Sequence, residues 1–192
     1  MFAYGMRWTR LFDDLEAQLI RLEQAERAAD VSDRVRSERG HITLLEALAV
    51  DCGRTVTMEA QGIGSLRGVL REVGKDWCIL ESTTAGSARQ RAILLPATSL
   101  QSVTGLSGFA DQRESASRRR FGVRSALRAL ARDRAMVRVY LTGGGNVQGT
   151  IDRIGQDHFD VADHPDDAPR RVAEVRAVHT VPLWAMCALR QV

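Results

Sequence analysis

Apolar and polar positions alternate in the same order at two places in the chain. Residues 66–81 (LRGVLREVGKDWCILE) align without a gap on residues 147–162 (VQGTIDRIGQDHFDVA). Gly68 coincides with Gly149, and the Gly-x-Asp that follows in each stretch also coincides. Alternation on both sides of such a turn is typical of a β-hairpin. The pattern therefore predicts that one small β-module occurs twice in this chain.

The patterns around both hairpins predict the same order of elements. Helical periodicity precedes each hairpin, and further alternating segments follow it. In the first module we expect a helix at 42–50, a first strand at 54–60 and two closing strands at 91–96 and 99–103. In the second module we expect a helix at 123–132, a first strand at 136–141 and two closing strands at 171–175 and 177–181. Residues 183–189 form an apolar tail, which we expect to pack against the N-terminal helix.

The first forty residues carry a long helical pattern. Apolar residues recur at three- and four-residue steps from Arg7 to about Arg39, and no Pro or Gly interrupts them before Gly40. At about 1.5 Å per residue this helix would be about 50 Å long, which exceeds one small module. Its apolar face could pack across both modules of its own chain, or pair with a second chain as a coiled coil. The pattern leaves both open.

These patterns predict a mostly β, α+β protein with four parts. The parts are a long amphipathic N-terminal helix at 1–40, a first five-stranded module at 41–104, a basic linker rich in Ser, Gly and Arg at 105–122, and a second five-stranded module with an apolar C-terminal tail at 123–192. Each module is expected to begin with a short helix.

Composition narrows the class of protein. The chain of 192 residues is 44% hydrophobic and 27% charged, as in ordinary soluble domains. No apolar run approaches the roughly 20 residues of a membrane helix, and the first residues lack the pattern of a secretory signal. Cys52, Cys78 and Cys187 are odd in number and in no C-x-x-C spacing. We therefore expect reduced core cysteines in a cytoplasmic protein.

Positive charge is concentrated in one segment. Lys75 is the only lysine, a skew that a GC-rich genome produces, so the abundance of arginine alone says little about ligands. Between Gly105 and Arg134, however, eight arginines stand against three acidic residues, a balance of +5, whereas the whole chain carries +3. The basicity is therefore local, and it favours an acidic partner at this segment.

The arginines of this segment are the best candidates for contacts with a nucleic acid. Arg118, Arg119 and Arg120 precede Phe121, and Arg124, Arg128 and Arg132 follow at four-residue steps on the predicted helix. Residues four apart share one helix face, so these three form a stripe that could lie along phosphates, while Phe121 stacks on a base. The alternative is a solvated linker followed by an ordinary exposed helix face.

Patterns that carry catalysis are missing. The four histidines (41, 158, 164 and 179) have no metal-ligand spacing, and Gly143–Gly145 is not followed by the Gly-Lys-Ser/Thr of a phosphate-binding loop. No Ser or Cys lies in a nucleophile motif. We therefore expect no enzyme activity, no cofactor and no metal.

A short helix and five short antiparallel strands, with a glycine in the second strand, resemble the Sm-like fold of LSm and Hfq proteins. The second module is the better match, through residues 137–141, 147–151 and 175–182, and the resemblance covers roughly 42–104 and 124–184. It implies two tandem Sm-like, SH3-like small barrels, with Gly149 where the second strand bends sharply. It also implies that edge strands pair between modules or between chains, and that the protein binds RNA.

The resemblance is incomplete at the residues that read RNA. Hfq carries a Lys-His pair before the final strand, and the matching positions here are Val175-Arg176 in the second module and Ala97-Thr98 in the first. Only Arg176 could keep a phosphate-binding role. Tyr140 and Phe159 are the candidates for the aromatic residue that stacks on a base in such proteins.

Together these observations give a primary hypothesis and two alternatives. The primary hypothesis is a non-catalytic RNA-binding protein that forms a homo-oligomer, most simply a dimer through the N-terminal helix. The first alternative is a protein–protein scaffold that uses the long helix and the sheet edges. The whole chain is also similar to an uncharacterised group from GC-rich bacteria sometimes labelled Fis-type transcriptional regulators, which implies a DNA-binding regulator as the second alternative.

Overall fold

The computed structural model describes residues 40, 42–82, 92–107, 121–163 and 176–192. The chain divides into two compact units, Met1–Ile42 and Thr43–Val192. Every helix and strand described below belongs to the second unit. The predicted long helix at 7–39, the predicted strand at 171–175 and most of the predicted linker lie outside the described residues.

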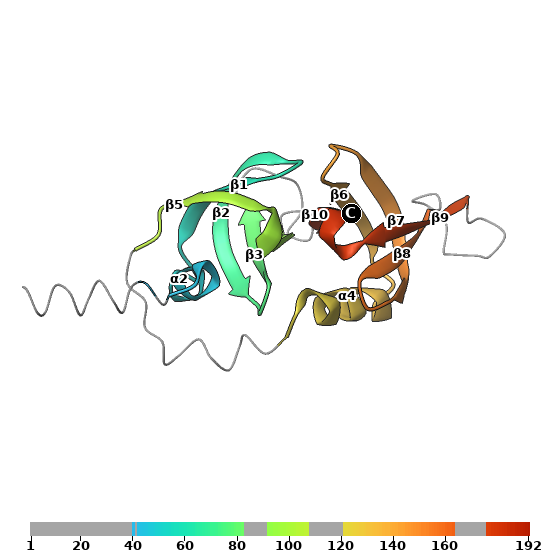
Figure 1. The fold of residues 1–192 in the computed structure, drawn as a ribbon, viewed down its shortest axis with the longest axis horizontal. Coiled ribbons are helices and arrows are strands. Elements are labelled where there is room, and N and C mark those ends of the chain that lie inside the picture. The colour runs from blue at the N-terminus through green and yellow to red at the C-terminus, as the bar shows by residue number, and fades with distance from the viewer. Residues whose placement is uncertain (1–39, 41, 83–91, 108–120, 164–175) are drawn as a thin grey trace, which may run out of the picture. The chain divides into compact units, whose positions relative to one another are not determined.

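The second unit consists of two halves with the same order of elements (Figure 1). The first half contains α2 (Leu44–Val50), β1 (Thr55–Ala60), β2 (Gly64–Val73), β3 (Trp77–Ser82), β4 (Ala92–Pro96), the 3-10 turn η1 (Ala97–Ser99) and β5 (Leu100–Thr104). The second half contains α4 (Val123–Arg132), β6 (Met136–Leu141), β7 (Asn146–Ile154), β8 (His158–Asp163), β9 (Ala177–Pro182), the 3-10 turn η4 (Leu183–Ala185) and β10 (Met186–Gln191).

The prediction of two separate five-stranded barrels is wrong. All ten strands form one antiparallel open sheet in the order β5-β1-β2-β3-β4-β10-β6-β7-β8-β9. The described residues contain two α-helices, both short. The sheet is continuous because β10 pairs with β6 of its own half and also with β4 of the first half, where Leu189 faces Leu94 and Arg190 faces Ile93.

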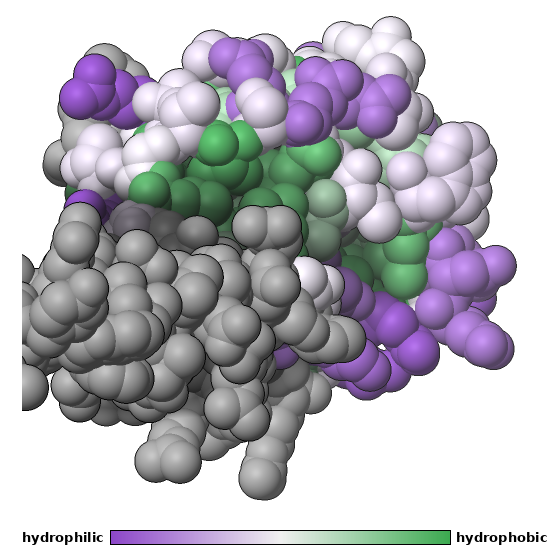
Figure 2. Space-filling view, turned by 60° about the vertical axis from the view of Figure 1, so that its left-hand side comes forward, coloured by the Kyte–Doolittle hydropathy of each residue, from purple (hydrophilic) through white to green (hydrophobic). Residues whose placement is uncertain are grey.

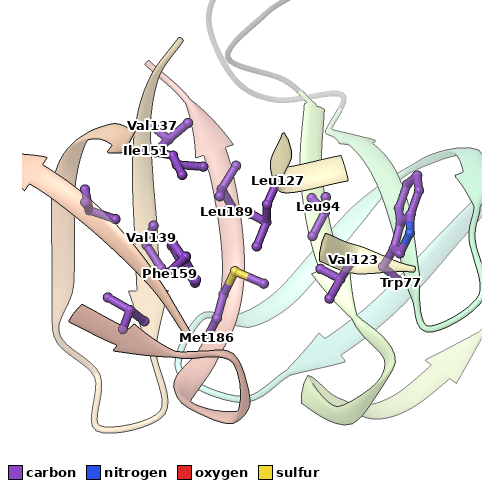
Figure 3. Packing of buried hydrophobic residues seen from close by; sticks show 12 residues of the cluster. Trp77, Leu94, Val123, Leu127, Val137, Val139, Ile151, Phe159, Met186 and Leu189 are labelled. Carbon is purple, nitrogen blue, oxygen red and sulfur yellow. The ribbon is translucent and has the colours of Figure 1, made fainter. Parts of the chain in front are cut away.

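Burial explains why β10 joins the two halves. Met186, Cys187, Ala188 and Leu189 are all at most 2% exposed, so both faces of this strand are covered. The core of the second half extends across the junction, since Leu94 and Trp77 of the first half pack with Leu189 and with α4 (Figure 3). Conversely, Ala188 of β10 in the second half packs in the core of the first half. Apolar burial of this kind is the main stabilising force of folding.

The C-terminal segment differs from its prediction because it takes part in the contact between the two halves. The predicted helix at 123–132 and the predicted strand at 136–141 coincide with α4 and β6. Residues 183–189, predicted as an apolar tail, instead form η4 and most of β10. The predicted last strand at 177–181 is β9, the fourth strand of its half and an edge of the sheet. The error arose because a run without strict alternation was interpreted as a tail, whereas a strand buried on both faces does not alternate.

The glycine repeated in the second strand of each half marks a close approach of two backbones. A Cβ on Gly149 would lie 2.0 Å from the carbonyl oxygen of Ala162, and one on Gly68 would lie 2.3 Å from that of Glu81. Both contacts are with backbone of the neighbouring strand, which cannot move aside as a flexible side chain does. Only glycine therefore fits at these two positions.

Replacing Gly149 with alanine should lower the free energy of unfolding by about 3 kcal/mol, because the new methyl group forces the β7–β8 pair apart. The matched control is Gly143→Ala, since a Cβ on Gly143 meets no atom within 4 Å. The control should change stability by less than about 0.5 kcal/mol. Urea denaturation followed by circular dichroism measures both, and equal effects of the two variants would contradict the packing described here.

Candidate nucleic-acid interface

Helix α4 is amphipathic and carries the predicted arginine stripe. Val123 and Leu127 are buried on one face and pack into the core of the second half. Arg128 and Arg132 lie on the solvent side and are exposed, whereas Arg124 is half-buried. The four-residue spacing thus places two guanidinium groups on the same exposed face, about one helical turn apart.

The start of α4 is anchored by the turn between β2 and β3 of the first half. Gly122 is the N-cap residue and has no side chain to cap the helix. Asp76 takes this role from another part of the chain, since its Oδ1 accepts a hydrogen bond from the Val123 N–H at 2.6 Å. A carboxylate at a helix N-terminus satisfies a free N–H and interacts favourably with the helix dipole.

The same turn fixes the backbone of Phe121. The indole Nε1–H of Trp77 donates to the Phe121 carbonyl oxygen at 2.9 Å, and the Lys75 N–H donates to the same oxygen at 3.1 Å. Phe121 as a whole remains 63% exposed. Because the backbone of Phe121 is already held, a ligand that stacks on its ring has to order only the side-chain torsions.

Phe121 and the exposed arginines share one groove. The groove has a volume of about 380 Å³ and is lined by Phe121, Ser125, Ala126, Arg128 and Arg132. It therefore offers an aromatic face, two cationic groups and a hydroxyl within one concave surface. Such a combination suits a ligand that has both a planar ring and negative charge.

The other predicted binding residues have different fates. Arg118, Arg119 and Arg120 lie outside the described residues. Arg124 is half-buried, and its Nε atom is buried without a hydrogen-bond partner among the described residues. Arg176 is exposed at the start of β9, where its N–H donates to the Asp163 carbonyl oxygen at 2.9 Å, and it does not line the groove.

The predicted place of Arg176 before the final strand is wrong. The final strand of the second half is β10, and the residues that precede it are Leu183, Trp184 and Ala185 of η4. Trp184 is 74% exposed and was not among the predicted binding residues. The signal was present in the sequence, because Pro182-Leu-Trp-Ala repeats the position of Pro96-Ala-Thr-Ser in the first half.

Neither aromatic residue suggested by the resemblance is an open stacking platform. Phe159 is 0% exposed and lies in the core of the second half. Tyr140 is half-buried and packs against the core of the first half. Among the described residues, the aromatic side chains that reach solvent most fully are Phe121 and Trp184.

The described residues contain no group of three or more His, Cys, Asp or Glu side chains that could hold a metal ion. Burial raises the pKa of the Cys78 thiol to about 12, with a further contribution from Cys52, and burial also raises the pKa of Cys187. Thiols with raised pKa values are poor nucleophiles at neutral pH. Asp157 and His158 form an exposed pair on the β7–β8 turn, and the hydrogen bond between their side chains lowers the pKa of Asp157.

Comparisons with known proteins add no family to this description, since no family model and no curated protein matches the chain. Within the described ranges, no helix combines the length and the apolar character that a membrane crossing requires.

Replacing Asp76 with alanine should remove the cap of α4 and lower the free energy of unfolding by about 1 kcal/mol. Asp157 occupies the same position in the second half, where its side chain bonds to His158 and caps no helix, so Asp157→Ala is the control and should change stability by less than about 0.5 kcal/mol. Asp76→Asn should recover most of the loss because its amide oxygen still accepts the bond. Guanidinium denaturation of the three variants measures these differences, and an Asp76→Ala variant as stable as the control would show that the cap is unimportant.

Cys78 and Cys187 should not react with a thiol reagent at pH 8 while the protein is folded. Both are fully buried, and for Cys78 the pKa of about 12 leaves almost no thiolate. Because this pKa lies above the ordinary value of 9.0, the contribution of the neutral thiol to stability is complete below pH 9 and is lost as the pH rises toward 12. Labelling with DTNB before and after unfolding measures the difference, and rapid labelling of Cys78 in the folded protein would contradict its burial.

Proposed function

We propose that the protein binds single-stranded RNA without catalysis, and that α4 and Phe121 provide the binding surface. The observation that carries this proposal is the groove in which an exposed aromatic ring lies beside Arg128 and Arg132. The reduced state of its three cysteines, two of them buried, is compatible with action in the cytoplasm.

In this proposal the arginines bind phosphates and Phe121 stacks on a base. The two guanidinium groups attract phosphates, and the release of condensed counterions supplies a binding free energy that falls as salt rises. The Phe121 ring stacks on one base, which contributes about 1–3 kcal/mol and shows little preference among bases. A base must be unstacked from its neighbours to reach the ring, so a single strand or a loop is favoured over a duplex.

The double variant Arg128→Ala/Arg132→Ala should weaken binding at least tenfold at low salt and reduce the slope of log affinity against log salt by about 1.4, since about 0.7 counterions are released per contacted phosphate of a single strand. Phe121→Ala should weaken binding by about 1–3 kcal/mol and leave the salt slope unchanged. Fluorescence anisotropy with a labelled single-stranded RNA of mixed sequence measures both quantities.

The charge-matched control is Arg67→Ala/Arg71→Ala, which removes two positive charges from exposed positions on β2, where Arg71 forms an ion pair with Glu81. It should leave affinity and slope close to those of the unmodified protein. Three results would overturn the proposal: no binding at low salt, an equal loss in the control, or a preference for duplex DNA over RNA. The last of these would favour a DNA-binding regulator.

A further inference from the structure

Two arginines face each other on neighbouring strands in the interior of the sheet. Arg138 of β6 and Arg190 of β10 are paired residues of these antiparallel strands. Facing residues of such a pair have their Cβ atoms about 5 Å apart, on the same side of the sheet. Like charges in this position repel each other, so the pair lowers stability unless negative charge compensates it.

The internal repeat shows that the fold does not require this pair of charges. The aligned glycines of β2 and β7 pair with the residues just before Thr57 and Arg138, so Thr57 corresponds to Arg138. Thr104 and Arg190 lie at the same distance after the 3-10 turn of their half, so they also correspond. Thr57 faces Thr104 in the first half, as Arg138 faces Arg190 in the second. The same backbone arrangement is therefore compatible with a neutral pair.

Both arginines point away from the core of the second half. Val137, Val139 and Leu189, their neighbours along the strands, belong to that core, and successive side chains of a strand alternate between the two faces. Ala188 lies on the same side as Arg190 and packs in the core of the first half. Apolar and hydrophilic side chains also adjoin on the surface, as Figure 2 shows for one face. A half-buried charge beside apolar atoms loses part of its hydration and attracts an opposite charge more strongly than it would in water.

The two guanidinium groups retain hydrogen-bond donors that the described residues do not use. Arg138 donates from Nε and Nη2 to the Gln148 Oε1 atom at 3.0 and 2.6 Å, which fixes its position. The Nε atom of Arg190 is buried and has no partner within the described part of the chain. None of the ion pairs within the described ranges includes either arginine. A buried donor without an acceptor is unfavourable, so a ligand that supplies an acceptor would stabilise this place.

The geometry of a facing pair suits a tetrahedral oxyanion better than a carboxylate. The two oxygens of a carboxylate are filled by the fork of a single guanidinium group. A phosphate group has more oxygens and more negative charge, so it can accept hydrogen bonds from two guanidinium groups at once.

We propose that Arg138 and Arg190 together bind a phosphate group, either free phosphate or the phosphomonoester of a nucleotide. The bound anion replaces repulsion between β6 and β10 by attraction to both strands. Because β10 also pairs with β4, binding stabilises the strand that joins the two halves. Neither arginine lines the groove at α4 and Phe121, so this site does not depend on RNA binding.

Thermal unfolding of the full chain in phosphate tests the site. The variant Arg138→Thr/Arg190→Thr carries the pair that the first half already has. Phosphate raises the Tm of many proteins without binding to a site, so the quantity to measure is the difference between the unmodified protein and this variant, at constant ionic strength. At about ten times its Kd, phosphate should raise the Tm of the unmodified protein by about 4 °C more than that of the variant.

The sign of the effect without phosphate is a second readout. In a phosphate-free buffer of low salt, the double threonine variant should unfold at the same temperature as the unmodified protein or at a higher one, because the repulsion is removed. A purely structural role of the two arginines would instead lower the Tm of the variant under all conditions.

Calorimetric titration with inorganic phosphate measures the affinity and covers the case in which the double variant does not fold. Arg190→Lys keeps the charge but loses the planar fork, and it should weaken binding by about tenfold. The charge-matched control Arg67→Ala/Arg71→Ala should bind phosphate as the unmodified protein does. A parallel titration with a nucleoside monophosphate identifies the source: tighter binding than that of phosphate indicates a nucleotide, and weaker binding indicates free phosphate.

Three results would overturn the proposal. They are the absence of binding of phosphate and nucleotide in the millimolar range, an equal rise of Tm in the protein and its double threonine variant, or an unchanged affinity of Arg190→Lys. A protein that binds phosphate at this site but no RNA would contradict only the proposed function.

Discussion

The pairing of β10 with β4 determines how the two halves of the described chain meet. This pairing converts two five-stranded halves into one sheet and buries residues 186–189 from both sides. Once the halves are joined in this way, the β2–β3 turn of the first half lies beside the start of α4, where Asp76 caps the helix and Trp77 binds the Phe121 carbonyl oxygen. The candidate site therefore belongs to neither half alone: the second half supplies the groove, and the first half holds one end of it in place.

The sequence predicted the local elements well and their assembly poorly. Alternation around the repeated Gly-x-Asp turns located both hairpins, and helical periodicity located α4 at its observed bounds. Strand β10 was not predicted because it lies inside the sheet and is buried on both faces. Its sequence is therefore apolar throughout and lacks the alternation of apolar and polar residues that indicates a strand. The closed barrels were wrong for a related reason, since periodicity within a segment carries no information about which strand a free edge will pair with.

The candidate site was predictable only in part. Arginines at four-residue steps after an aromatic residue were enough to indicate Arg128, Arg132 and Phe121, which line one groove. Burial separates Arg124 from them, because that side chain lies closer to the core face of α4. The role of Asp76 could not be foreseen, since it acts on a helix 47 residues away in the chain. The exposure of Trp184 was not predicted, because the segment that contains it and β10 was interpreted as a buried tail.

Amide hydrogen exchange resolved to single residues tests whether β4 and β10 form an interior pair of one sheet. Stable backbone hydrogen bonds in central strands exchange only through large-scale unfolding. If the sheet is continuous, amides of β4 and β10 should exchange as slowly as those of β7, at protein concentrations low enough to keep the chain monomeric. Fast exchange along β4 and β10, at the rate of the edge strands β5 and β9, would instead show that the two halves are separate and that no continuous sheet forms.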